Sequence, residues 1–157
     1  MATITPFLWY DTQAEEAAKL YVSIFPRSKI KNITHYGEGA PGPKGGVMTV
    51  VFELDGSEYI ALNGGPMYRF TEAVSFSVAC RTQEEVDRYW KLLSQGGEEG
   101  PCGWLKDRFG LSWQVTPTIL GEMLSDSDPA KAKRVMDAML KMNKIDIEKL
   151  KKAYRGK

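Results

Sequence analysis

The chain has 157 residues, of which 43% are hydrophobic and 26% are charged, as in ordinary globular domains. This composition excludes a fibrous or wholly disordered protein, and the net charge of +1 gives no general attraction for nucleic acid. No apolar run approaches the ~18 residues of a membrane-spanning helix, and the first residues lack the pattern of a secretion signal. Two cysteines are too few for a disulfide scaffold, so we expect a cytoplasmic protein without nucleic-acid or membrane partners.

The first half of the chain predicts one strand, one helix and three further strands. Residues 5–10 alternate like a strand, and residues 11–25 place apolar side chains at helical spacing. The later strand-like stretches are residues 30–36, 46–54 and 57–63. Asp55-Gly56 is a typical two-residue turn and predicts that the last two of these strands form a hairpin.

The second half repeats this order about 70 residues later. Residues 73–79 alternate again, and Thr82 with Glu85 forms a capping box at the start of a helical stretch that Gly96-Gly97 ends. Two more strand-like stretches surround the turn at residues 107–110. The repeat predicts two β-α-β-β-β units in an α+β arrangement with bent sheets.

The end of the chain is strongly basic. Residues 130–157 contain ten Lys or Arg against three Asp or Glu. Apolar residues recur at helical spacing from Val135 to Met142, and Asp128-Pro129 is a typical helix start. Such a helix can bind nucleic acid or a membrane surface. We expect the simpler alternative, a docked surface helix with a solvated basic face.

Few residues point to covalent or acid–base chemistry. Cys102 is the best candidate nucleophile, with Lys106 nearby in sequence, but a structural thiol is the expected role. His35, the single histidine, is expected on a strand surface or edge and excludes an all-histidine metal site. The glycine-rich segment 37–46 lacks the lysine and helix start of a phosphate-binding loop, so we expect a lid or hairpin loop.

Two β-α-β-β-β units in a chain of this size resemble the vicinal oxygen chelate superfamily, which includes glyoxalase I and bleomycin-resistance proteins. The chain is most similar to its PhnB-like branch, often labelled 3-demethylubiquinone-9 3-methyltransferase. The motifs that carry the likeness are FLWYDTQAEEAAKLYVSIFP, ALNGGP, FTEAVSFSV, TQEEVDRYWKLLSQGGEEGPCGWLKDRFGLSWQVTP and DPAKAKRVMDAMLKM.

This resemblance implies an α+β, glyoxalase-like fold of two tandem βαβββ modules whose sheets form cup-shaped half-barrels, followed by C-terminal helices. We expect a single glyoxalase-like domain over residues 1–157, with a first module at 1–66, a second module at 67–117 and a helical tail at 118–157. The resemblance also implies a homodimer.

Most members of the superfamily hold a divalent metal with four residues, two from each module. The family pattern places these positions at Ile4, Ala61, Ala73 and Gln114. Three aliphatic residues and one amide do not replace the carboxylates and imidazoles that such metals need. We therefore expect no metal and no other cofactor.

Strand alternation counted from these positions assigns two faces to each sheet. The face expected to form the cup contains Ile4, Pro6, Leu8, Tyr59, Ala61, Asn63, Ala73, Ser75, Ser77, Ser112, Gln114 and Thr116. The face expected to pack on the helices contains Phe7, Trp9, Ile60, Leu62, Val74, Phe76, Val78, Trp113 and Val115. The candidate ligand-binding residues are Leu8, Tyr59, Asn63, Ser75, Trp104, Lys106 and Gln114.

Three functions remain open at this point, and no catalytic residue is assigned. The first is a metal-free homodimer that binds or sequesters a small organic molecule. The second is a lyase, isomerase or dioxygenase that acts through a metal held elsewhere or through Lys106, Cys102 or Tyr59. The third is the methyltransferase of the family label, for which the sequence contains no recognisable S-adenosylmethionine motif.

Overall fold

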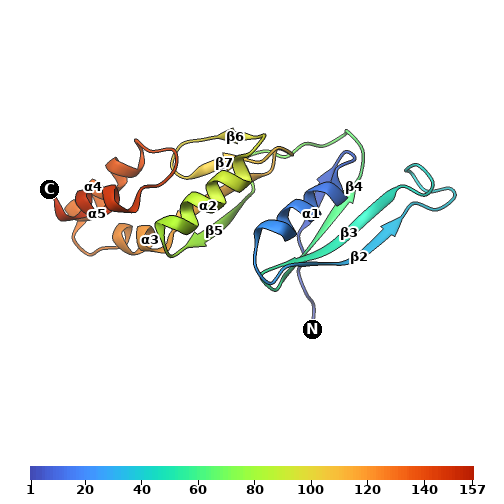
Figure 1. Cartoon of the computed structure of the whole chain (residues 1–157), viewed down its shortest axis with the longest axis horizontal. Coiled ribbons are helices and arrows are strands. Elements are labelled where there is room, and N and C mark those ends of the chain that lie inside the picture. Colours follow the sequence, from blue (N-terminus) through green and yellow to red (C-terminus); the bar gives the residue numbers. More distant parts are fainter. The chain divides into compact units, whose positions relative to one another are not determined.

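The strands form two separate four-stranded sheets, each in its own compact unit of the chain. The computed structural model describes residues 1–157 and divides into a first unit, residues 1–70, and a second unit, residues 71–157 (Figure 1). Each unit contains one sheet built in the order strand, helix, strand, strand, strand. The predicted α+β fold of two βαβββ modules is therefore confirmed, and neither sheet closes into a barrel.

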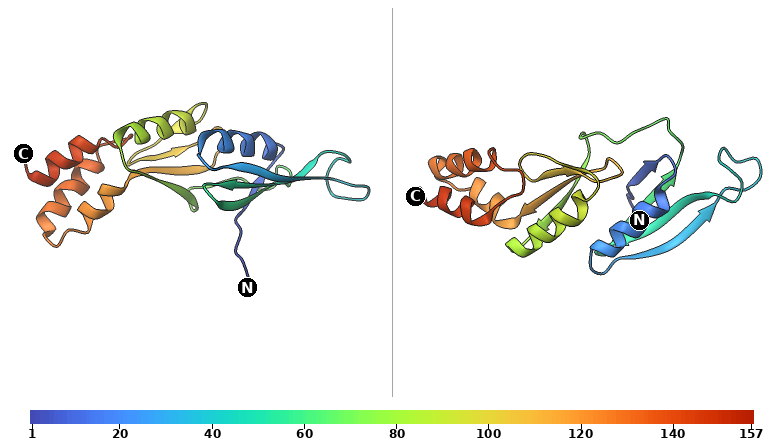
Figure 2. Two further views of the ribbon diagram at one scale, coloured as in Figure 1. Left: turned by 60° about the horizontal axis from the view of Figure 1, so that its bottom comes forward. Right: turned by 45° about the horizontal axis from the view of Figure 1, so that its top comes forward.

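The first unit is a sheet with one helix on one face (Figure 2). Its elements are β1 (Phe7–Tyr10), α1 (Ala14–Ile24), β2 (Lys29–His35), β3 (Val47–Leu54) and β4 (Ser57–Asn63). The strand order is β1-β4-β3-β2, and β1 runs parallel to β4 while the other neighbours are antiparallel. The predicted turn Asp55-Gly56 joins β3 to β4.

Small side chains let α1 lie close to this sheet. Ala14, Ala17 and Ala18 are fully buried and share one face of the helix with Tyr21. The Tyr21 ring packs against Phe52 of β3, with ring centroids 6.3 Å apart. The helix-covered face of the sheet is therefore the core of the first unit.

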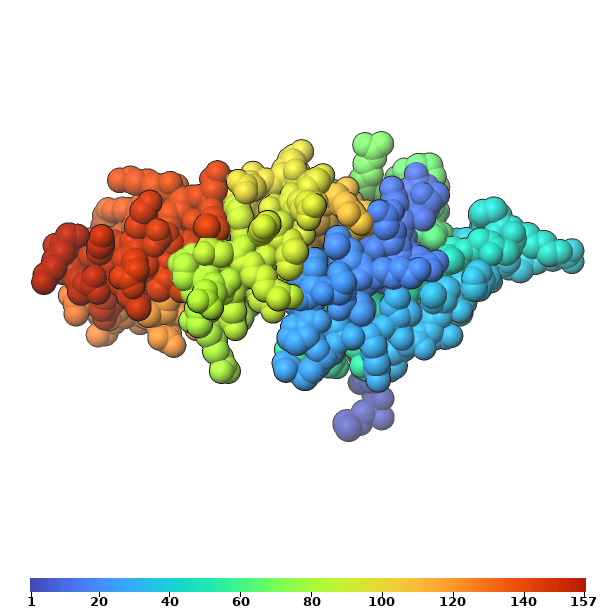
Figure 3. All heavy atoms as spheres, in the orientation of Figure 1, coloured from blue at the N-terminus to red at the C-terminus, as the bar shows by residue number.

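The glycine-rich segment 37–46 is the loop of the β2–β3 hairpin, as the sequence predicts. The hairpin pairing continues one residue beyond β2, because Tyr36 exchanges backbone hydrogen bonds with Gly45 and Gly46, each 2.8 Å long. The loop extends away from the sheet of its unit (Figure 3). His35, at the end of β2, is exposed, as expected.

The second unit has the same plan, followed by three further helices. Its sheet elements are β5 (Ser75–Cys80), α2 (Gln83–Ser94), β6 (Glu98–Glu99), β7 (Trp104–Lys106) and β8 (Ser112–Pro117). The strand order is β5-β8-β7-β6, with β5 parallel to β8. The short strand β6 is not predicted by the sequence, because two glutamates between glycines have no strand pattern.

Helix α2 begins where the sequence predicts. The Thr82 side chain accepts a hydrogen bond from the Glu85 N–H, and the Glu85 carboxylate accepts one from the Arg81 N–H. The buried side chains of this helix, Val86, Trp90 and Leu93, face the sheet. Their contact with the sheet covers one of its faces and leaves the other face open.

The C-terminal helices are α3 (Thr118–Leu124), α4 (Pro129–Met139) and α5 (Ile147–Arg155). They pack together (Figure 2) around buried residues from each helix and from the α4–α5 connection: Leu120, Met123, Val135, Ile145 and Leu150. Asp128 caps α4 with Pro129 at its first position, as predicted, and Asp146 caps α5. The tail is thus a small helical unit with its own apolar core. Every helix of the structure is too short or too polar to span a lipid bilayer.

One buried carboxylate organises the turn between β7 and β8. Asp107 is 2% exposed, and its carboxylate accepts hydrogen bonds from the N–H groups of Phe109 and Leu111. Its second oxygen accepts a bond of 2.9 Å from the indole Nε1–H of Trp113. These three donors satisfy the buried charge, so Asp107 fixes the turn to the centre of the sheet.

We expect Asp107→Ala to lower the free energy of unfolding by about 3 kcal/mol, because it removes the acceptor of three N–H groups, two of which are buried. Asp137→Ala is the matched control, since Asp137 forms an exposed pair with Lys133 on α4. This control should change stability by less than about 0.5 kcal/mol. Urea unfolding followed by tryptophan fluorescence measures both variants, and equal stability of the two would contradict the role given to Asp107.

Candidate ligand-binding site

The predicted face assignment is wrong for the first unit. Leu8 and Ala61, expected in the cup, are neighbours on the face covered by α1 and are 5% and 0% exposed. Phe7, expected in the core, is 60% exposed on the opposite face. The predicted alternation is counted from Ile4, which lies outside β1 and is 96% exposed. The predicted faces of β1 and β4 are therefore exchanged.

Asn63 lies on this helix-covered face and serves the fold. Its Oδ1 accepts a hydrogen bond of 2.8 Å from the Ala14 N–H at the start of α1. Its Nδ2 donates to the Val47 carbonyl at 3.0 Å. The amide thus replaces the side-chain cap that Gln13 does not provide and ties the helix to β3.

Tyr59 also lies on the helix-covered face. Its ring stacks on Phe52, with centroids 5.6 Å apart. Burial raises the pKa of the Tyr59 phenol above its usual value, so the group stays protonated at neutral pH. It is not prepared to act as a base there.

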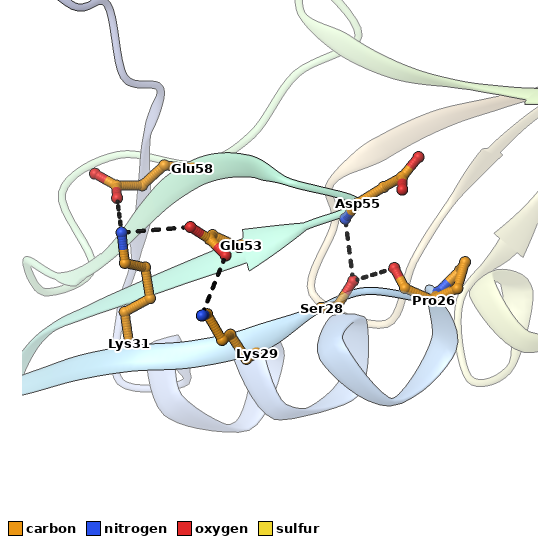
Figure 4. Close-up of polar contacts among 7 residues, drawn as sticks. All are labelled: Pro26, Ser28, Lys29, Lys31, Glu53, Asp55 and Glu58. Carbon is orange, nitrogen blue, oxygen red and sulfur yellow. Dashed lines mark hydrogen bonds and ion pairs between the residues drawn. The ribbon is translucent and has the colours of Figure 1, made fainter.

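The open face of the first unit is apolar with a charged end. Trp9 and Leu62 are neighbours on it, as are Phe7 and Ile60. At the charged end, Lys31 Nζ lies 2.8 Å from a Glu58 oxygen and 3.3 Å from a Glu53 oxygen (Figure 4). These two hydrogen bonds raise the pKa of Lys31. The charged groups pair with one another and mark where the apolar surface ends.

In the second unit the predicted faces are correct for β8. Trp113 and Val115 are buried against α2, whereas Gln114 lies on the open face. Gln114 Nε2 donates a hydrogen bond of 2.9 Å to Ser75 Oγ, and Trp104 is the neighbour of Gln114 on β7. The structure thus brings together three of the predicted ligand-binding residues, Ser75, Trp104 and Gln114. Val74 departs from its predicted core position, because it precedes β5 and is 64% exposed.

A cavity of about 230 Å³ opens beside these residues. It is lined by Glu72, Glu98, Glu99, Gly100, Pro101, Trp104, Leu105, Lys106 and Ser112. Lys106 forms an ion pair with Glu72, and this contact raises the pKa of Lys106 and lowers that of Glu72. The side chains of both are partly exposed, at 40% and 58%, so the pair is open to water and can exchange partners.

The most unusual group in the cavity wall is Ser112. The residue is 1% exposed, and its hydroxyl is a buried side-chain group without a hydrogen-bond partner. Leaving a buried hydroxyl unpaired costs about 1–3 kcal/mol. The alternation of β8 placed Ser112 on the open face, but the sequence has no signal that marks its hydroxyl as unpaired.

The cysteines are structural in character. Cys80 is fully buried at the end of β5, and burial raises the pKa of its thiol to about 11. Cys102 is partly exposed, and its backbone is in the left-handed region with φ 58°. Both cysteines belong to the second unit, whereas His35 belongs to the first.

The residues at the family's metal positions do not fit a divalent ion. Ala61 lies beneath α1, and the amide of Gln114 is bonded to Ser75. The structure contains no group of three or more His, Cys, Asp or Glu side chains placed to hold a metal. The donor chemistry that such ions need is absent from these positions.

Comparisons with known proteins agree with this fold. A family model described as 3-demethylubiquinone-9 3-methyltransferase matches residues 2–116. The chain belongs to this family. It is 36% identical to a putative 3-demethylubiquinone-9 3-methyltransferase, PhnB protein, from Bacillus cereus, with a TM-score of 0.67 over 74% of this chain and 100% of that chain. The predicted place in the PhnB-like branch of the vicinal oxygen chelate superfamily is thus confirmed.

More distant structures share the fold alone. A protein from Pseudomonas aeruginosa is 20% identical, with a TM-score of 0.62 over 74% of this chain and 98% of that chain. The fosfomycin resistance protein FosX from Listeria monocytogenes is 16% identical, with a TM-score of 0.53 over 78% and 97%. No curated protein sequence matches the chain. Because the family match ends at residue 116, the three C-terminal helices lie beyond it.

Proposed function

We propose that this member of the PhnB-like family is a metal-free homodimer that binds a small organic molecule in the cavity of the second unit. The observation that carries the proposal is the Ser112 hydroxyl, which is buried and unpaired in the wall of that cavity. Native proteins pair nearly all their buried polar groups, and those left unpaired need an explanation. A bound molecule that displaces the side chains covering this hydroxyl and exchanges a hydrogen bond with it supplies one.

The other lining groups define the chemistry of this molecule. The cavity is smaller than the about 300–1,000 Å³ of ordinary ligand pockets, so it takes a small molecule or one end of a larger one. Trp104 offers an aromatic surface for an apolar part of the molecule. The walls contain three carboxylates and one ammonium group, which favours a neutral or cationic molecule over an anion.

The groups near the cavity do not favour covalent catalysis. A lysine acts as a nucleophile only when its pKa is lowered, whereas the contact with Glu72 raises the pKa of Lys106. Tyr59 belongs to the first unit and does not line this cavity, and its raised pKa opposes its use as a base there. A lyase, isomerase or dioxygenase activity is the alternative function. Turnover of a bound compound would support it. The methyltransferase activity of the family label is not proposed.

Ser112→Ala tests the binding site directly. We expect it to weaken binding about tenfold and to stabilise the unliganded protein by about 1 kcal/mol, since it removes a buried unpaired hydroxyl. Ligand-observed NMR with a library of small aromatic amides and amines identifies a probe, and titration gives its affinity. Thermal unfolding without the probe gives the stability.

Ser77→Ala is the matched control, because Ser77 lies on the same open face in β5 but outside the cavity. It should leave both quantities unchanged. If neither Trp104→Ala nor Ser112→Ala weakens the binding of any compound in the library, the proposed site is wrong.

The metal-free state has its own test. Protein purified without chelators should contain far less than one transition metal ion per chain by plasma mass spectrometry, because the four family positions provide no strong ligand. Addition of Mn²⁺, Ni²⁺ or Zn²⁺ should give no stoichiometric binding heat in calorimetry. One tightly bound ion per chain would contradict the proposal and would make a metal-dependent enzyme the better model.

The apolar open face of the first unit supports the homodimer. Phe7 is 60% exposed there, and Met67 and Tyr68 in the following segment are 74% and 60% exposed. Large exposed apolar surfaces of this kind are typical of protein–protein interfaces. We therefore place a second copy of the chain against this face.

Phe7→Asp should convert the dimer into a monomer, because the new carboxylate would be buried without a partner. Size-exclusion chromatography with light scattering measures the mass in solution. Leu140→Asp is the control, since Leu140 is a similarly exposed apolar residue, at 59%, on the C-terminal helices. A monomeric unsubstituted protein, or a Phe7→Asp variant that stays dimeric, would argue against this interface.

A further inference from the structure

We infer that the C-terminal helices, which lie beyond the family match, hold one wall of the cavity in place, and that Gln83 is the positioning residue of this contact. The contact itself is independent of any ligand. Its consequence for binding rests on the proposed function.

The cavity wall and the tail meet through backbone hydrogen bonds. The N–H groups of Cys102 and Gly103 donate to the carbonyls of Met142 and Asn143, each at 2.8 Å. On its other side, the Gly103 carbonyl accepts a bond of 2.8 Å from the Val115 N–H of β8. The segment 102–103 is thus held between the sheet and the α4–α5 connection, which lie side by side in Figure 1.

The conformation of this segment depends on these bonds. Cys102 has φ 58° and Gly103 has φ 81°, so both are in the left-handed region, which a non-glycine residue adopts only at a cost. Ile145 of the tail is fully buried, and a Cβ atom on Gly103 would lie 3.2 Å from its Cγ1. The close fit and the paired amides stabilise a backbone that β7 and its loop do not favour alone.

Gln83 fixes the tail at this place. Its Oε1 accepts a hydrogen bond of 2.8 Å from the Ile147 N–H, and its Nε2 donates to the Ile145 carbonyl at 3.0 Å. One amide side chain on α2 therefore binds both sides of a single stretch of the tail. Asp87, one turn further along α2, adds an ion pair of 2.8 Å with Lys144.

The held segment leads directly into the cavity wall. The Trp104 N–H donates to the Pro101 carbonyl at 3.0 Å, and the Gly100 N–H donates to the Trp104 carbonyl at 2.8 Å. Gly100, Pro101 and Trp104 all line the cavity. Where the tail holds residues 102–103, it also sets the position of the Trp104 ring and thereby the shape of the site.

The test compares Gln83→Met with Gln95→Met in the full chain. Methionine keeps the length of the side chain and removes its three hydrogen bonds, two with the tail and one of 2.9 Å from Nε2 to the Asp87 carboxylate. Gln95, at the end of the same helix, is exposed. Amide hydrogen exchange gives the protection of Cys102 and Gly103, with the amides of β5 as internal references. The ¹⁹F resonance of residue 104 in 5-fluorotryptophan-labelled protein, assigned with Trp104→Phe, reports the ring environment.

We expect the amides of Cys102 and Gly103 to exchange about tenfold faster in Gln83→Met, with the references unchanged and the Trp104 resonance shifted. Gln83→Glu keeps the acceptor for Ile147 but loses the donor and brings a second carboxylate beside Asp87, so it should accelerate exchange at least as much as Gln83→Met. Gln95→Met should match the unsubstituted protein. Unchanged exchange at Cys102 and Gly103, or equal acceleration throughout the unit, would overturn the inference.

The result of the exchange experiment can be distinguished from the result of the ligand-binding experiment. If no compound of the library binds but the exchange result holds, the tail positions the loop and the binding proposal fails. If compounds bind in a Ser112-dependent way and Gln83→Met leaves exchange and the resonance unchanged, the binding proposal stands and this inference fails.

Discussion

Strand β8 is bonded on both sides, to β5 in parallel and to β7 in antiparallel pairing, and this register decides which side chains meet in the second unit. Because side chains alternate along a strand, Trp113 and Val115 must face α2 once Ser112 and Gln114 face the other way. The same pairing puts Ser112 beside Lys106, and Gln114 beside Trp104. The Asp107 carboxylate, bonded to the Trp113 indole, holds the turn that sets this register.

The two units show why strand alternation was a reliable guide in one place and not in the other. In β8 the polar residues Ser112 and Gln114 alternate with Trp113 and Val115, so only one phase buries the apolar set. In β1 both faces are apolar, since Leu8 and Tyr10 alternate with Phe7 and Trp9. Because neither face of β1 is polar, the sequence does not indicate which face is buried. Packing against the small residues of α1 determines that Leu8 and Ala61 lie on the buried face.

Element types could largely be predicted, whereas the interactions that build the site could not. Both βαβββ units, the cap at Thr82 and the helix start at Asp128 follow from local patterns of residue types. The unpaired state of Ser112 depends on which atoms lie around it after folding. The role of Asn63 as a cap for α1 depends on a contact 49 residues away in sequence, which no local pattern contains.

The way the tail is held has an evolutionary consequence. Residues 142, 143, 145 and 147 bond to the segment 102–103 and to Gln83 through their own backbone atoms, so the identities of these four residues matter little for the hydrogen bonds. The side-chain requirement falls instead on Gln83 and on the absence of a side chain at Gly103. In relatives that possess such a tail, the residues at positions 142 and 143 are free to vary, whereas position 145 must stay apolar to fill the core of the tail. A glutamine and a glycine in the preceding module record the presence of the tail.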